Sequence, residues 1–387
     1  MTFQHQLVPT SKANHRPSRE RQESHSGALP AICDVSVTNV CNAACTFCGF
    51  SREKKLSGPR RYIDLEGFTR ALPILRRHGI RYLTYQGGEP LLHPKIVQLV
   101  SEASDSGIQC GLITNGWFLT RHIHSLKAAG LKRLLISIDS EKIASHEMNR
   151  GLRGLGPRIK QSIDAARTHG IPVWASVTVN RLVNIEALPE TLAGLGFDAV
   201  AFSYPRRDPF GSTSLVYDED SKLIDYTPEE LLTVLQEILR LKQKFRVLDP
   251  AESLKEVGRF LRGEKQRVPC IGGHKYFYID WNLDLWRCEA WSEPLGSVFD
   301  WDNIPDQREP CNACIMSCYR HASVLMHAPI AAEDSVRALS RGELGTAVKT
   351  LFGPGVGASL RALAFEHWPR FTLTSATRRL RHNGTAR

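Results

Sequence analysis

The chain has 387 residues, of which 42% are hydrophobic and 23% are charged, and these values are typical of a globular protein with a buried core. No stretch approaches the roughly 18 consecutive apolar residues that a membrane-spanning helix needs, and the polar N-terminus excludes a secretory signal. The net charge is +10, but residues 1–30 carry +2 of it and residues 366–387 carry +4. The rest of the chain is only mildly basic, so nucleic acid is not an expected partner.

The cysteines fall into two groups. We expect the chain to stay in the cytoplasm, where thiols remain reduced and grouped cysteines more often bind metal than form disulfides. Two of the ten cysteines stand alone, at Cys33 and Cys110. The first group is Cys41, Cys45 and Cys48, and the second group is Cys270, Cys288, Cys311, Cys314 and Cys318.

The N-terminal half predicts an arm followed by a barrel. Residues 1–30 are polar and interrupted by prolines, so we expect a disordered arm. From residue 31 onward, short β-rich runs alternate with segments of helical periodicity, which predicts parallel βα units. The runs are residues 31–37, 81–86, 108–114, 133–139, 172–179 and 199–204. Six consecutive units predict an α/β fold in which residues 31–205 form a partial (β/α)6 TIM-like barrel, with its chemistry at the carboxyl ends of the strands.

The C-terminal half predicts three regions. Residues 206–265 connect the barrel to a small cysteine-rich auxiliary domain at 266–325, and residues 326–387 form helices with a basic tail. The connection contains a loop and a helix at 228–245. The final helices are expected at 332–350 and 357–366. Because they mix apolar and basic faces, contact with a membrane or lipid is an alternative, but packing on the auxiliary domain is favoured.

The first cysteine group has metal-binding spacing. Cys41, Cys45 and Cys48 place three soft thiolates within eight residues, which selects an iron–sulfur cluster or zinc. A structural zinc site closes with four ligands, whereas a cubane cluster held by three cysteines leaves one iron open to a small molecule. The alternatives are a zinc knuckle completed by a remote residue and three reduced buried thiols.

This segment resembles the radical S-adenosylmethionine (radical SAM) superfamily, whose three cysteines have this spacing and an aromatic residue before the last, here Phe47. The resemblance implies a 4Fe–4S cluster on Cys41, Cys45 and Cys48 as the catalytic centre. It also implies reductive cleavage of S-adenosylmethionine to a 5′-deoxyadenosyl radical, with flavodoxin or ferredoxin as electron donor. In such an enzyme the cofactor performs the difficult chemistry and the protein directs it.

Later segments match the same family in the same order. The resemblance assigns S-adenosylmethionine contacts to residues at the ends of three predicted strands and in an HxxxRG element. They are Gly87, Gly88 and Glu89 after the second strand, Asn115 after the third, Ser137 and Asp139 at the end of the fourth, and Arg150 in the HxxxRG element. Glu89 would accept a hydrogen bond from the methionine amine, and Arg150 would pair with the methionine carboxylate. Glu147 stands where the family commonly has Asp, and Asn180 lies at a place that is often polar.

Each of these later segments also has an ordinary structural interpretation. Gly87-Gly88-Glu89-Pro90 would be a turn before a helix, Ser137 and Asp139 would cap a strand end, and Asn180 would be a turn residue. Their joint occurrence in order is what favours the family.

The second cysteine group predicts a four-thiolate site. The aromatic segment between Cys270 and Cys288 predicts a β-hairpin, and Cys311 and Cys314 follow on a turn. Spacing alone does not separate zinc from iron–sulfur. The segment resembles the SPASM domain or its shorter twitch form, which implies an auxiliary 4Fe–4S cluster on Cys270, Cys288, Cys311 and Cys314.

Three details qualify this resemblance. Relatives often have Gly five residues before the second cysteine, where this chain has Leu283. Cys318 is then a spare thiol that could replace Cys311 or Cys314 as a ligand. Cys33 and Cys110 are expected to be core thiols, and Cys110 and Cys318 are weak candidates for a hydrogen-atom donor.

The resemblance implies an oxidoreductase-type enzyme that oxidises or epimerises a small molecule with help from the auxiliary cluster. Only about thirty residues precede the first strand, so a small-molecule substrate is expected over a leader peptide. One alternative is a maturase of ribosomal peptides within the same superfamily. The alternative of another class is a non-catalytic metal- or Fe–S-binding module.

Overall fold

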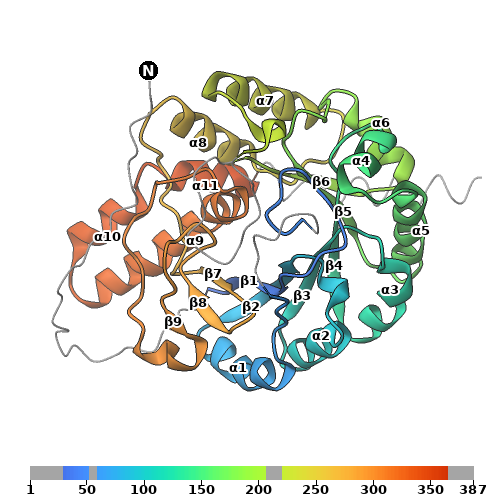
Figure 1. The fold of residues 1–387 in the computed structure, drawn as a ribbon. Helices are drawn as coiled ribbons and strands as arrows, with labels where there is room; N and C mark the ends of the chain where they lie inside the picture. Colours follow the sequence, from blue (N-terminus) through green and yellow to red (C-terminus); the bar gives the residue numbers. More distant parts are fainter. Residues whose placement is uncertain (1–28, 52–58, 206–219, 365–387) are drawn as a thin grey trace, which may run out of the picture.

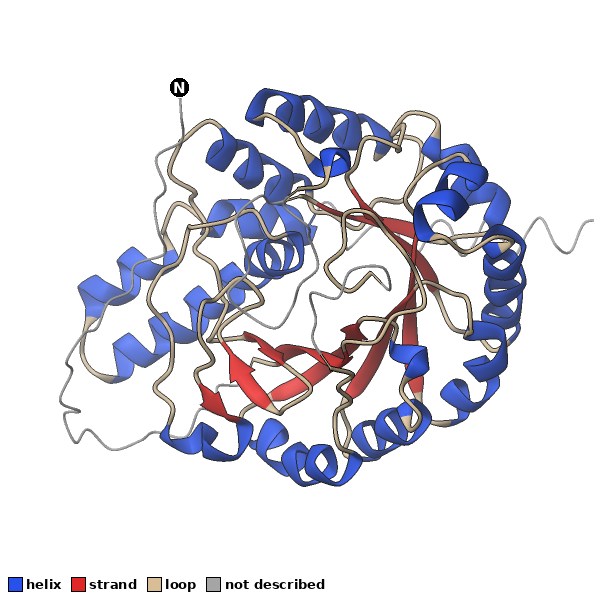
Figure 2. Ribbon diagram, in the orientation of Figure 1, coloured by secondary structure: helices blue, strands red, loops and turns tan. Residues whose placement is uncertain are grey.

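The computed structural model describes residues 29–51, 59–205 and 220–364. Its described strands form one sheet in the order β6-β5-β4-β3-β2-β1-β7-β8-β9. The first six run parallel in sequence order: β1 Ala31–Thr38, β2 Ile80–Gly87, β3 Gln109–Thr114, β4 Leu131–Ser137, β5 Val173–Thr178 and β6 Ala199–Ser203. Figures 1 and 2 show that these strands curve into an open barrel with helices outside, so the predicted partial barrel is confirmed.

Helices follow the strands and cover the outer face of the sheet (Figure 1). They are α1 Leu65–Arg77, α2 Ile96–Asp105, α3 Leu119–Ala128, α4 Ile143–Arg150, α5 Leu155–Thr168 and α6 Leu188–Leu195. Strand side chains that point outward contact these helices. The Tyr85 hydroxyl donates a hydrogen bond to the Leu99 carbonyl of α2 at 2.7 Å, and Cys110 lies against the same helix. Since strand side chains alternate between faces, Asp34 and Ser36 of β1 point to the opposite, inner face.

The hairpin predicted in the cysteine-rich segment extends the barrel sheet. Strand β7 (Tyr276–Ile279) pairs in parallel with β1, β8 (Asp284–Trp286) pairs antiparallel with β7, and β9 (Gly296–Ser297) completes the edge. The β1 edge of the barrel would otherwise expose unpaired backbone groups. Pairing with β7 brings the second cysteine group next to the barrel interior.

The remaining helices close the open side of the barrel. They are α7 Pro228–Leu241, α8 Ala251–Leu261, α9 Ser317–Ser340, α10 Leu344–Leu351 and α11 Val356–Ala362, with short 3-10 turns η2 Pro90–Leu92, η3 Lys222–Ile224 and η4 Val298–Asn303. Helix α9 packs against β6, α8, α10 and α11. It begins well before the helix predicted at 332–350 and ends before Gly342, whose φ of +78° stops it.

No helix in the described part of the chain is long and apolar enough to span a bilayer. The predicted arm, apart from its last residues, the loop 206–219 and the basic tail from residue 365 lie outside the described residues.

Candidate active site

The first cysteine group lies on the loop that follows β1 and reaches over the barrel interior (Figure 1). Cys45 and Phe47 are buried, and Cys41 and Cys48 are half-buried. The loop is tightly turned, because the Cys48 amide donates to the Cys45 carbonyl at 3.2 Å and the Ser51 amide donates to the Cys48 carbonyl at 3.1 Å. The three thiols therefore sit at the carboxyl edge of the parallel strands, where the sequence predicted the chemistry.

The buried environment of these thiols disfavours their ionisation. Burial raises the pKa of Cys41 to about 12, with the Glu89 charge adding to the effect. Burial also raises the pKa of Cys45, although the Arg150 guanidinium opposes it. A thiolate at either position needs a strong positive centre, and bound metal deprotonates thiols outright. The Ala43 amide already donates to Cys41 Sγ at 3.4 Å, the kind of contact that tunes cluster sulfurs.

A single metal ion does not account for the arrangement. In residues 29–51, 59–205 and 220–364, no three His, Cys, Asp or Glu side chains are arranged to hold one ion. A cubane cluster does not require that geometry, because each thiolate binds a different iron atom. The donor set and its loop fit a cluster with one open iron.

The end of α4 holds the cysteine loop in place. The Ala44 amide donates to the Arg150 carbonyl at 2.8 Å, and the Thr46 hydroxyl donates to Asn149 Oδ1 at 3.0 Å. The Asn149 amide group in turn donates to Asp139 Oδ2 at 2.9 Å. Sequence reasoning missed Asn149, although it directly precedes Arg150 in the HxxxRG element.

Two residues predicted to contact S-adenosylmethionine bind each other. Arg150 donates to both oxygens of Asp139, from Nε at 2.8 Å and from Nη2 at 2.6 Å. Burial alone would raise the pKa of Asp139, but Arg150 and His146 outweigh burial and hold that pKa well below its usual range. The pair joins the end of β4 to α4, directly beside Cys45. Their separate contacts with the ribose and the methionine carboxylate stay predictions.

Glu89 is buried between the ends of β2 and β3. Its carboxylate accepts hydrogen bonds from the Thr114 hydroxyl at 2.6 Å, the Asn115 amide at 2.8 Å and the Leu91 amide at 3.0 Å. Burial raises its pKa although these bonds oppose the shift. A carboxylate has about four acceptor positions, so one remains for a ligand amine. That contact stays a prediction.

Gly87 and Gly88 lie directly against the β1 loop. A Cβ on Gly87 would lie 2.3 Å from the Thr38 carbonyl oxygen, and a Cβ on Gly88 would lie 2.3 Å from the Val40 carbonyl oxygen. The Gly88 amide donates to Thr38 at 2.8 Å. The sequence predicts that these glycines let the backbone approach a ligand closely. In the structure they also let it approach the β1 loop closely, because neither residue has a Cβ.

The other predicted polar residues connect the strand ends. Asn115 donates to Asn42 Oδ1 at 2.9 Å, which ties the end of β3 to the cysteine loop. Ser137 donates to the Thr114 carbonyl at 3.4 Å, and Asn180 donates to the Asp139 carbonyl at 2.9 Å. The carboxyl edge of β1 to β5 is thus one hydrogen-bonded network.

The second cysteine group converges from three segments. The Cys270 amide donates to the Cys311 carbonyl at 2.9 Å, in an isolated antiparallel bridge. Burial raises the pKa of Cys270 to about 11, and the nearby Cys314 and Cys311 add to it. Burial likewise raises the pKa of Cys288, with Cys314 and Cys270 adding. Neighbouring thiols from three segments fit a cluster in which each thiolate binds a different iron atom.

Cys318 packs in the same side-chain cluster as Cys270, Cys288 and Cys314. Burial raises the pKa of the Cys318 thiol, and the nearby charges of Glu289 and Asp34 raise it further. The Tyr276 side chain forms a hydrogen bond with Cys318, which lowers that pKa. Cys318 therefore faces the inner face of β1 and β7. Cys110 faces α2 instead, on the side of the sheet away from the barrel interior.

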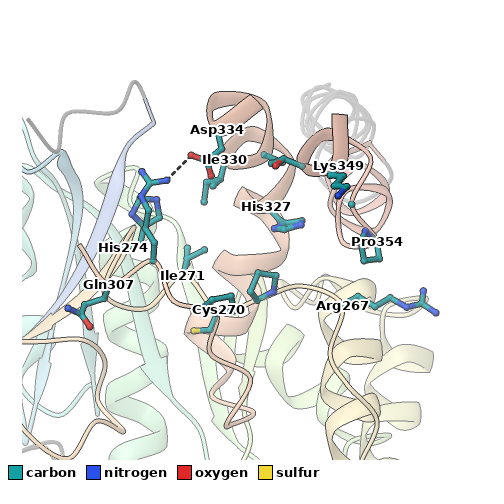
Figure 3. Close-up of a pocket in the computed structure, with 16 residues that line it drawn as sticks. Arg267, Cys270, Ile271, His274, Gln307, His327, Ile330, Asp334, Lys349 and Pro354 are labelled. Carbon is teal, nitrogen blue, oxygen red and sulfur yellow. Dashed lines mark hydrogen bonds and ion pairs between the residues drawn. The ribbon is translucent and has the colours of Figure 1, made fainter. Parts of the chain in front are cut away.

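A cavity of about 340 Å³ borders Cys270 on the side of α9 and α10 (Figure 3). Arg267, Arg308 and Lys349 line it, and Arg308 Nη1 pairs with Asp334 at 2.7 Å. The second cysteine group is thus close to a basic part of the molecular surface.

Comparison with known proteins finds similarity in the barrel region of the chain. Residues 35–194 match the model of the Radical SAM superfamily. An AdoMet-dependent heme synthase of Methanosarcina barkeri is 30% identical over 164 residues, 42% of this chain and 46% of that protein. A GTP 3′,8-cyclase of Mesorhizobium japonicum is 31% identical over 173 residues, 42% of this chain and 51% of that protein. The chain thus spans about half the length of the curated relatives it matches.

Two solved structures share the fold. Streptococcus suis SuiB, bound to the precursor peptide SuiA, has a TM-score of 0.52 at 15% identity, covering 72% of this chain and 65% of that one. Native anSMEcpe, with bound AdoMet and a peptide, has a TM-score of 0.53 at 14% identity, covering 70% of this chain and 78% of that one. At these identities the likeness concerns the fold alone.

Proposed function

This chain contains a radical SAM domain, and from that premise we propose that Cys41, Cys45 and Cys48 hold its catalytic 4Fe–4S cluster. When bound, the cluster supplies one electron that breaks the S–C5′ bond of S-adenosylmethionine, and the 5′-deoxyadenosyl radical then abstracts hydrogen from a substrate. The observation that carries this proposal is the position of the three thiols on one loop, fixed between the Glu89 turn and the end of α4.

The surrounding residues position the loop and the cofactor. Glu89 offers a carboxylate already oriented by Thr114 and Asn115, so little reorganisation is needed to accept the methionine amine. The Asp139–Arg150 pair keeps a balanced charge beside Cys45 and retains guanidinium hydrogens for the methionine carboxylate. Gly87 and Gly88 let the two loops lie in contact.

We further propose that Cys270, Cys288, Cys311 and Cys314 hold an auxiliary 4Fe–4S cluster, and that the enzyme oxidises or epimerises a small molecule. The polar inner face between the two cysteine groups supports a polar substrate. Reduced flavodoxin or ferredoxin in the cytoplasm would be the electron donor, and the basic surface beside Cys270 suits an acidic carrier. Peptide maturation is the second candidate, favoured by the peptide-bound proteins of the same fold.

The test is 5′-deoxyadenosine formation by the anaerobically reconstituted protein with dithionite and S-adenosylmethionine. Cys41→Ala, Cys45→Ala and Cys48→Ala should each abolish it, because the cluster then lacks a ligand. Cys110→Ala is the matched control, since its thiol faces α2 and not the site. Turnover in any of the three variants at the control's rate would refute the assignment.

A further inference from the structure

Two carboxyl groups lie on the inner face of the barrel, outside the network already described. Asp34 and Ser36 of β1 are in register with Thr84 and Gln86 of β2. The Tyr276 hydroxyl of β7 donates to Asp34 Oδ2 at 2.9 Å, and Gln86 donates to Glu289, the residue after Cys288. Asp34 is 4% exposed and Glu289 is 6% exposed. The carboxyl groups thus lie deep between the two cysteine groups.

Two hydroxyl groups beside them have no hydrogen-bond partner among the described residues. They are Ser36 Oγ and Tyr319 OH, and both residues are 1% exposed. Ser36 lies on the same face as Asp34, two residues further along β1. Tyr319 of α9 stacks on Tyr276, with ring centroids 4.2 Å apart. A bound polar group would supply the hydrogen-bond partner that each of these buried hydroxyls lacks.

The ionisable groups at this place are the carboxyl groups of Asp34 and Glu289, and burial raises the pKa of each. Burial raises the pKa of Asp34 to about 6, whereas Tyr276, Thr84 and the more distant Arg133 lower it. The hydrogen-bond partners of the Asp34 carboxyl group are the neutral hydroxyls of Tyr276 and Thr84, and the cation that acts on it is the distant Arg133. A ligand that brings its own positive charge would compensate the buried carboxylate without requiring a protein cation.

We propose that Asp34, Ser36 and Tyr319 form a subsite that binds an amino group of the substrate. An ammonium group has three N–H donors, which match one carboxylate and two free hydroxyl oxygens. This inference rests on the proposed function, and it names the substrate class as small amines, such as an amino alcohol or amino sugar, or a peptide presenting a free amine.

The depth of the subsite agrees with the chemistry above it. Ser36 lies two residues before Thr38, the residue that contacts Gly87 and Gly88. At about 3.3 Å per residue along a strand, Ser36 lies about 7 Å from Thr38 and Asp34 about 13 Å. A substrate held by its amine at Asp34 would therefore extend along β1 toward the carboxyl ends of the strands.

The first test uses turnover of the full, reconstituted chain with S-adenosylmethionine and dithionite. The probe is a polar extract of the cells that carry the gene, used either untreated or with its amines acetylated. The untreated extract should raise 5′-deoxyadenosine formation above each protein's own basal rate, and acetylation should remove the increase. Asp34→Asn should reduce the increase by about tenfold to a hundredfold, the effect of losing a charged hydrogen bond. Ser36→Ala should reduce it several-fold, and Asp300→Asn, an exposed carboxyl elsewhere, should not.

The second test measures binding directly, with ethylammonium and ethanol as probes. The affinity for ethylammonium should be about tenfold lower in Asp34→Asn than in the wild type, and Asp300→Asn should match the wild type. The affinity for ethanol should be the same in all three proteins. Equal ethylammonium affinity for wild type and Asp34→Asn overturns the subsite, as does extract-stimulated turnover that survives acetylation. If the wild type makes no 5′-deoxyadenosine at all, the proposed function fails, while the binding comparison still decides the amine subsite.

Discussion

At the scale of single residues, Leu283 adopts a backbone conformation that suits glycine. Its φ is +64°, and it is the one non-glycine residue with positive φ among the described residues. Proteins with the domain that this segment resembles often have Gly at this place. The side chain is only 6% exposed and packs in the main core, so burial compensates for backbone strain.

Substitutions at Leu283 should separate the two effects. Leu283→Ala loses the buried side chain, which costs about 2–5 kcal/mol, and keeps the strain. Leu283→Gly loses the same packing but relieves about 1–2 kcal/mol of strain. Both variants should be less stable than the wild type, with Gly more stable than Ala. Denaturant midpoints measure this order, and an Ala variant that is more stable than Gly would contradict it.

The buried ion pair of Asp139 and Arg150 gives a second prediction. Asp139→Asn leaves a buried guanidinium without its carboxylate, which costs about 3–5 kcal/mol. Asp164→Asn is the control, because its pair with Lys160 is exposed and contributes under about 1 kcal/mol. The measurement is the free energy of unfolding of each variant.

The pH dependence of this effect has a definite sign. The folded-state pKa of Asp139 is lowered, so its contribution is present above its unfolded pKa of about 4. It is lost only as pH falls through the lower folded value. The stability difference between wild type and Asp139→Asn should therefore be equal at about pH 8 and about pH 9, above the range in which the neighbouring His146 side chain could change its charge. A difference that shrinks between these two pH values would argue against the ion pair.

At the scale of elements, the strand-and-loop pattern predicted the barrel, but pairing between distant segments could not be predicted. The alternation of β-rich and helical runs predicts β1 to β6. Because Cys41, Glu89 and Asp139 follow predicted strands, the same pattern predicts that they lie at the carboxyl edge of the sheet. Nothing local indicates that β7 pairs with β1, because that contact joins residues more than 240 positions apart. Asp34 and Glu289 were missed for the same reason.

The contact between the Gly88 turn and the cysteine loop gives a third prediction. Gly88→Ala places a Cβ against the Val40 carbonyl, so the loop that carries Cys41 must move. We expect at least about a tenfold loss of 5′-deoxyadenosine formation, because small misplacements of reacting groups are costly. Gly194→Ala on α6 is the control, since nothing lies within 4 Å of its Cβ position. Equal activity of the two variants would show that the loops are not coupled.

At the scale of the whole molecule, the fold brings both cysteine groups to the β1 side of one sheet, because the first group follows β1 and the hairpin of the second group pairs with β1. Cys270 and Cys311 pair in an isolated bridge, and Cys288 follows β8. The sequence predicted Cys270, Cys288, Cys311 and Cys314 as a set, but it left the place of Cys318 open. In the structure Cys318 packs with Cys270, Cys288 and Cys314 and also lies near Asp34 and Glu289, so it stays a candidate fifth thiol of this group.

Iron content tests that division of the cysteines. Cys318→Ala should retain the wild-type iron content, because its thiol is not needed as a ligand. Cys288→Ala should lose about four irons per chain, since the auxiliary cluster would lack one of its four ligands. Loss of iron in Cys318→Ala would instead make it a ligand.

The most direct measurement of the central assignment is iron per chain in three reconstituted proteins, together with 5′-deoxyadenosine formation. We expect about eight irons in the wild type, and about four in a variant lacking Cys41, Cys45 and Cys48 and in a variant lacking Cys270, Cys288, Cys311 and Cys314. The first variant should make no 5′-deoxyadenosine, whereas the wild type does. A wild type that binds a full complement of iron yet never cleaves S-adenosylmethionine, or a first variant that still cleaves it, would contradict a radical enzyme built on Cys41, Cys45 and Cys48.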